Sequence, residues 1–228
     1  MATYGLTWLQ IINRVLVRMR ESTVAANNTT DYSTQIGQVV NAVKSEIENA
    51  WMWHALRDTF SVVCTNTVSH YALTSAGARG KIIDGWNTTT GGQLEKSTNR
   101  DFNSKFFGTG SAAISTGSPT MYLAAGLDTN YDASVDVWPI PVTGAGAGDT
   151  LKFNVYVPQN DLAADGTIPL VPQDVLIEET IARMKVERGD EDALKPAQGE
   201  TFILRDLLAQ AIMADGGADD SEFDWTAE

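Results

Sequence analysis

Residues 135–158, VDVWPIPVTGAGAGDTLKFNVYVP, contain two apolar runs joined by a glycine-rich loop. The first run ends in the sequence WPIP, and the second alternates between apolar and polar residues from Leu151 to Val157. Alternation with a period of two predicts strands, and a glycine-rich spacer predicts a turn. The stretch therefore predicts a hairpin, and it places an antiparallel β domain in the middle of the chain.

The loop of this hairpin carries Gly144, Gly146 and Gly148, and it has no side chain suited to catalysis. Such a composition predicts flexibility and little packing. We expect hairpin 135–158 to project from the β domain and to order its tip against a neighbouring protein. The three glycines are therefore candidate partner-binding positions, and shortening the loop is expected to leave stability nearly unchanged.

The rest of the β region shows shorter patterns of the same kind. Residues 59–74 alternate around a break at Asn66-Thr67, as the two strands of a hairpin do, and residues 80–96 predict a second hairpin with its turn at 87–92. A short helix is expected over 97–108 and a further strand over 119–127.

Helical patterns flank the β region on both sides. Thr7 and Gln10 form a predicted capping box at the start of the first helix, and Gly189 is the predicted end of a helix that begins after Pro172. The predicted fold class is α+β, with a helical bundle formed by the N- and C-terminal helices and an inserted antiparallel β domain. The expected divisions are 1–58 for the N-terminal helices, 59–168 for the β domain, 169–216 for the C-terminal helices and 217–228 for an acidic extended tail.

The acidic tail contains two aromatic residues, Phe223 and Trp225. The segment is too polar to fold alone, because it cannot bury enough apolar surface to offset its ordering entropy. Side chains at positions i and i+2 lie on the same side of an extended strand. We therefore expect Phe223 and Trp225 to dock together on a neighbouring protein.

The chain is strongly acidic: 29 acidic and 16 basic residues give a net charge of −13. Such a surface repels phosphate backbones and disfavours tight binding of nucleic acid. It is compatible with a surface past which DNA moves without adhering.

No catalytic, metal or cofactor pattern stands out. The only cysteine, Cys64, is expected to be buried on a strand face, and the two histidines, His54 and His70, fit neither a zinc motif nor a catalytic triad. The sequence GTGSAA at 108–113 matches a dinucleotide fingerprint, but ISTGSP directly after it leaves no room for the helix that the fingerprint requires. We predict no enzyme, no metal and no cofactor, and neither a signal peptide nor a membrane span.

The order of these features resembles the head-to-tail adaptor proteins of short-tailed bacteriophages, also called tail tubular protein A or gateway proteins. The resemblance covers roughly residues 5–212. It is carried by WLQIINRVLVRMRE (8–21), ENAWMWHALRD (48–58), VWPIP (137–141), FNVYVP (153–158) and IPLVPQDVLIEETIARMKVERGDEDA (168–193).

The resemblance implies a structural virion protein in the tail or neck, assembled in the host cytoplasm. Its subunits would form a ring, commonly of twelve, between the portal protein and the tail nozzle protein. Tail fibres or tailspikes would dock on the outside, DNA would pass through the lumen without specific binding, and no membrane would take part. Under this reading the portal is the expected partner of Phe223 and Trp225.

A second reading of the residues stays open. Trp86 and Trp138 lie in the β region, where exposed indole rings can stack on sugar rings. This alternative is a carbohydrate-binding or weakly carbohydrate-active β module. Burial of both indoles in the β core is the competing explanation of the same residues.

Overall fold

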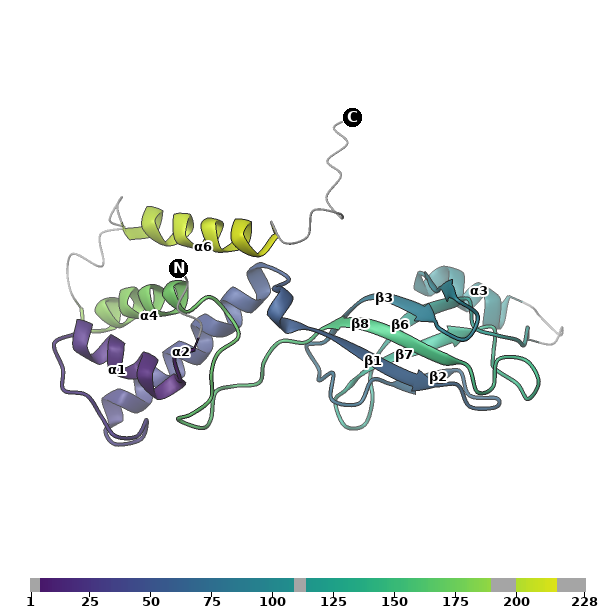
Figure 1. Ribbon diagram of the computed structural model, residues 1–228, viewed down its shortest axis with the longest axis horizontal. Helices are drawn as coiled ribbons and strands as arrows, with labels where there is room; N and C mark the ends of the chain where they lie inside the picture. Colours follow the sequence, from purple (N-terminus) through teal and green to yellow (C-terminus); the bar gives the residue numbers. More distant parts are fainter. Residues whose placement is uncertain (1–4, 109–113, 190–199, 217–228) are drawn as a thin grey trace, which may run out of the picture. The chain divides into compact units, whose positions relative to one another are not determined.

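A computed structural model of the chain describes residues 5–108, 114–189 and 200–216, and of 200–204 it describes the backbone alone. The fold class is α+β. The chain forms two compact units, a helical unit made of Met1–Ala55 and Gln159–Glu228 and a β unit made of Leu56–Pro158 (Figure 1).

The helical unit contains α1 (Trp8–Arg18), α2 (Asp31–Ala50), α4 (Gln173–Glu187) and α6 (Glu200–Gly216). Helices α1, α2 and α4 pack against one another, and α6 contacts α4 (Figure 1). Their facing stripes are apolar and fully buried, which is the condition for amphipathic helices to be stable together. The buried side chains include Ile11, Ile12, Val15, Ile36, Val40, Val43, Leu176, Ile181 and Met184.

Local capping sets where the helices begin. The predicted capping box of α1 is confirmed: the Thr7 hydroxyl accepts a hydrogen bond from the backbone N–H of Gln10, and the Gln10 side-chain oxygen accepts one from the backbone N–H of Thr7. Helix α2 begins at Asp31, because Thr30 and Ser33 form a second box of the same kind. It ends at Ala50, where Trp51 adopts an extended backbone conformation.

The end of α6 is fixed to the segment that follows α2. The carboxylate of Asp215 accepts hydrogen bonds from the indole N–H of Trp51 at 3.0 Å and from the backbone N–H of His54 at 3.1 Å. Two donors on one partly buried carboxylate give a directional, charge-assisted contact. The last turn of α6 is therefore held within the helical unit.

The segment that returns from the β unit differs from the expected division of the chain. Residues 159–168 were assigned to the β domain, whereas they belong to the helical unit. The amide of Asn41 exchanges two hydrogen bonds with the backbone of Leu162, at 3.1 and 2.8 Å, and the backbone N–H of Trp8 donates to Thr167. The segment has no strand pattern of its own, so its backbone groups are satisfied by α1 and α2.

A buried ion pair lies where this segment enters the helical unit. Lys44 and Glu48, one turn apart on α2, have fully buried side chains, and Lys44 Nζ lies 3.0 Å from Glu48 Oε1. Both also bind the backbone of Gln159: Lys44 donates to its carbonyl at 2.6 Å, and Glu48 accepts from its N–H at 3.1 Å. The attraction between the two charges offsets the cost of removing them from water, and the pair also satisfies the N–H and the carbonyl of Gln159.

Removing one member of this pair is expected to be costly. Glu48→Leu leaves the Lys44 ammonium buried without its counter-charge, and we expect the free energy of unfolding to fall by about 3–5 kcal/mol. Urea unfolding of the helical unit, followed by circular dichroism, measures this value.

Glu46→Leu is the matched control, with the same substitution two positions earlier on α2. The Glu46 side chain is 61% exposed and pairs with Arg183, so its loss is expected to cost about 1 kcal/mol or less. Equal losses for the two variants would show that the buried pair has no special role.

The β unit contains two four-stranded sheets. Sheet A has the order β1-β8-β3-β4, and sheet B has the order β2-β7-β6-β5. All neighbouring strands are antiparallel except β5 and β6. The strands are β1 (Arg57–Val63), β2 (His70–Ala72), β3 (Lys81–Asn87), β4 (Gly92–Gln93), β5 (Glu95–Lys96), β6 (Met121–Leu127), β7 (Ala133–Trp138) and β8 (Thr150–Tyr156).

The predicted hairpin 135–158 is wrong. Its two strands exist, but β7 pairs with β2 and β6 in sheet B, while β8 pairs with β1 and β3 in sheet A. The glycine-rich loop therefore connects the two sheets and does not form the tip of a projecting hairpin. Each strand is internal to its sheet, so both of its edges are already paired with other strands.

The predicted hairpin at 59–74 is wrong for the same reason, since β1 lies in sheet A and β2 in sheet B. The turn at 87–92 does join the short pair β3 and β4, but Glu95–Lys96 leaves that sheet and pairs with β6. The expected short helix is present as α3 (Asn99–Phe107), and the expected strand 119–127 is present as β6.

One apolar core joins the inner faces of the two sheets. Tyr122 of sheet B meets Phe153 of sheet A edge to face, with ring centroids 5.5 Å apart. Cys64 lies in this core, as its position in the sequence predicts. Other members of the core are Tyr71, Leu73, Ile82, Leu94, Val135, Val137, Leu151 and Val155.

Candidate functional site

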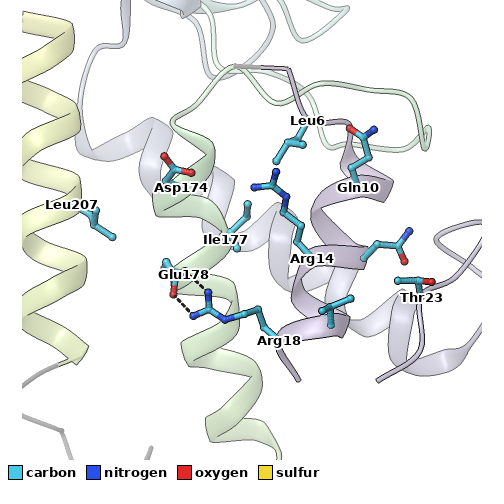
Figure 2. A pocket seen from close by; sticks show the side chains of 11 residues that line it. Leu6, Gln10, Arg14, Arg18, Thr23, Asp174, Ile177, Glu178 and Leu207 are labelled. Carbon is cyan, nitrogen blue, oxygen red and sulfur yellow. Dashed lines mark hydrogen bonds and ion pairs between the residues drawn. The ribbon is translucent and has the colours of Figure 1, made fainter. Parts of the chain in front are cut away.

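The helical unit contains an open groove of about 880 Å³ between α1, α4 and α6 (Figure 2). Side chains along α1, together with Leu6 just before it, form one wall, the first turns of α4 form the floor, and α6 contributes one residue. The lining residues are Leu6, Gln10, Asn13, Arg14, Val17, Arg18, Thr23, Asp174, Ile177, Glu178 and Leu207.

Two side-chain amides hold the walls of the groove in place. Gln173, at the start of α4, is buried; its Oε1 accepts from the N–H of Leu6 at 3.0 Å, and its Nε2 donates to the carbonyl of Leu6 at 3.1 Å. Asn13 makes the same exchange with the backbone of Val24, at 3.0 and 2.8 Å. Each exchange satisfies a donor and an acceptor at once, so the groove is largely preformed.

The lining combines charge with exposed apolar surface. Arg18 pairs with Glu178 at 3.2 Å across the groove, while Arg14 is exposed beside them (Figure 2). Val17, on the same helix, is 59% exposed. A mixed lining of arginine and aliphatic residues suits a peptide segment of another protein more than a small reacting substrate.

The sequence analysis missed this groove. Its walls come from α1 and from α4 and α6, and more than a hundred residues separate α1 from the other two in the chain. Helical periodicity does not say which helices become neighbours. One local signal was present: Val17 is an aliphatic residue on the polar face of α1, between Arg14 and Arg18 in space.

The structure corrects the view of Gly144, Gly146 and Gly148. All three have positive φ angles, +85°, +89° and +92°, which favour glycine strongly. The loop is not loose, because it is bonded to the segment after β1: Gly148 N–H donates to the carbonyl of Cys64 at 2.8 Å, and Thr143 N–H donates to the side chain of Asn66 at 2.9 Å. These glycines therefore shape an ordered connection.

Gly146 is the most constrained of the three. A Cβ atom placed there would lie 2.4 Å from the carbonyl oxygen of Gly117, whereas one at Gly144 would meet nothing within 4 Å. We expect Gly144→Ala to cost about 1–2 kcal/mol, through the left-handed backbone alone. Gly146→Ala should cost more, because the backbone at Gly117 must also move. Thermal melting of the two variants measures the difference, and equal melting temperatures would contradict the close approach.

The other predicted partner-binding residues, Phe223 and Trp225, lie outside the described residues. The same holds for most of the GTGSAA sequence.

Each of the two histidines lies beside one carboxylate. His70 Nδ1 lies 2.7 Å from Asp136, and His54 Nδ1 lies 3.1 Å from Asp215. Across residues 5–108, 114–189 and 200–216, no group of three or more His, Cys, Asp or Glu side chains is placed to hold a metal ion. Burial raises the pKa of the Cys64 thiol to about 11, which disfavours the nucleophilic thiolate.

Comparison of the sequence with known proteins found no match, either to a protein-family model or to a curated protein. Within the described ranges, no helix combines the length and the apolar character needed to cross a membrane. The proposed function therefore depends on the groove of the helical unit and on the charge of the chain.

Proposed function

We propose that the chain is a structural virion protein, a ring-forming head-to-tail adaptor that joins a portal to a tail nozzle. The observation that carries the proposal is the groove between α1, α4 and α6: it is preformed, open and lined by aliphatic, arginine, acidic and uncharged polar side chains. In the proposal, the groove receives a segment of a neighbouring protein in the assembly, and the subunit acts through contact.

The arrangement of the chain supports the same role. In the adaptor, the N- and C-terminal helices form one bundle, and the inserted β unit offers a second surface for fibres or tailspikes. The Lys44–Glu48 pair and the Asn41 amide bind the returning segment to α2. In the proposal, a partner that binds α1 and α4 therefore binds a helical unit whose connecting segment is fixed.

The net charge of −13 fits a protein that DNA passes. A lumen lined by such subunits would repel phosphate groups and would not retain the genome. The acidic tail, with Phe223 and Trp225, is proposed to add a contact with the portal. Buried aromatic side chains contribute large contact areas, and a contact repeated around a ring gains from avidity.

The groove is tested by a double substitution on the exposed side of α1. Val17→Asp with Arg14→Glu should abolish cosedimentation with the portal protein of the same virus, because it places two negative charges in the proposed contact. Both residues are exposed, so the melting temperature should change little.

Arg100→Glu combined with Val63→Asp, at two exposed positions of the β unit, is the charge-matched control and should bind like the unaltered chain. Negative-stain images of the complex would reveal whether the unaltered chain forms a ring on the portal. An unaltered chain that neither binds the portal nor forms a ring would refute the proposed function.

The tail is tested by truncation after Gly216. The tail is too polar to bury much apolar surface, so the shortened chain should keep the helical signal of the full chain. We expect it to bind the portal about tenfold more weakly or worse, as loss of buried aromatic anchors does. Undiminished binding would restrict the portal contact to the helices.

A further inference from the structure

The outer face of sheet A presents one exposed tryptophan among polar side chains. We define the Trp86 face as Thr59, Ser61, Asp84, Trp86, Lys152 and Asn154, which come from strands β1, β3 and β8. The intervening residues of β8, Leu151, Phe153 and Val155, point into the core, so the Trp86 face is the side of the sheet opposite the core.

The exposure of Trp86 follows from an irregularity in strand β3. Ile82 pairs with Val155, but the next paired residue is Asp84, which lies opposite Asn154, so Ile83 is an extra residue. A bulge of this kind changes which face the following side chains occupy. It places Ile82 and Gly85 on the core side and Asp84 and Trp86 on the outer side.

Packing on the core side of β3 fixes the register between β3 and β8. A Cβ atom at Gly85 would lie 2.8 Å from the Phe153 ring, so only glycine fits over that ring. Gly85 also accepts a backbone hydrogen bond from Leu94 at 2.8 Å. Trp86 is consequently held outward, with 43% of its surface exposed, on a strand that is internal to its sheet.

Polar groups beside the indole are ordered in advance. The hydroxyl of Thr59 donates to Asn154 Oδ1 at 2.7 Å, and Asn154 Nδ2 donates to Asp84 Oδ1 at 2.7 Å. Lys152 is the direct cross-strand neighbour of Trp86 on β8, and Gln93 is its neighbour on β4. Donors and acceptors therefore flank the indole on both sides along the sheet.

This combination matches the chemistry of a sugar ring. A pyranose has an apolar face of C–H groups that packs on an aromatic ring and a rim of hydroxyls that need donors and acceptors. A protein interface requires about 800 Å² on each partner with an apolar centre, whereas this face offers one indole within a polar surround. The opposite charges of Asp84 and Lys152 balance, which favours a neutral ligand in a chain that repels polyanions.

We propose that the Trp86 face binds a neutral oligosaccharide of hexopyranose units, with one ring stacked on the Trp86 indole and its hydroxyls bonded to Asp84, Lys152 and Asn154. The site is separate from the groove of the helical unit and does not depend on ring formation. The second tryptophan considered above, Trp138, has a different environment: its Nε1 is buried, and Lys105 Nζ lies 5.0 Å from its ring centroid. It is not part of the proposed site.

A printed array of neutral and acidic oligosaccharides, probed with the full chain, tests the ligand class. Titration calorimetry with the best neutral ligand then compares variants. We expect Trp86→Ala to weaken binding about tenfold or more, Lys152→Ala to weaken it by a smaller factor, and Trp86→Tyr to retain most of the affinity. Phe107→Ala removes an exposed aromatic side chain elsewhere in the β unit and should leave binding unchanged.

Three results would overturn the proposal: no binding to any neutral oligosaccharide on the array, binding restricted to acidic oligosaccharides, or equal affinities for Trp86→Ala and the unaltered chain. Trp86→Ala lies outside the core, and its melting temperature checks that it folds. If it fails to fold, Lys152→Ala and Trp86→Tyr decide, because unchanged binding by the first or loss of binding by the second contradicts the stacked geometry.

Discussion

The helical unit depends on a buried ion pair. Lys44 and Glu48 lie on the buried side of α2, and together they bind both backbone groups of Gln159. Burying either charge alone would cost several kcal/mol, so each requires the other. The chain that returns from the β unit is thereby held against α2 at Gln159. This contact fixes where segment 159–172 enters the helical unit on its way to α4.

Three side-chain amides on helices also hydrogen-bond to the backbone of segments outside the helices. Asn41 binds Leu162, Asn13 binds Val24 and Gln173 binds Leu6, each through one donated and one accepted hydrogen bond. Loops fixed in this way lose little further entropy when a partner binds. This preorganisation makes the groove between α1, α4 and α6 suitable for binding a segment of another protein.

Two features of the β unit arise from departures from regular strand pairing, and one of them produces the Trp86 face. The bulge at Ile83 determines that Trp86 points outward, and the glycine loop 144–148 connects the two sheets in close contact with Gly117. The left-handed glycines are thus explained by the packing of the loop, and the Trp86 indole is left 43% exposed on the outer face of its sheet.

The sequence alone determined the local features. The capping box at Thr7, the helix after Pro172, the strands 135–138 and 150–156 and the burial of Cys64 were predictable, because each depends on the residues nearby in the chain. Only the tertiary structure decided which strands pair, how the loop 144–148 packs and which helices form the groove. Alternation says that a strand has two faces but not which strand lies beside it. Pairing is fixed by burial of the whole inner surface of both sheets, and this is a property of residues far apart in the chain.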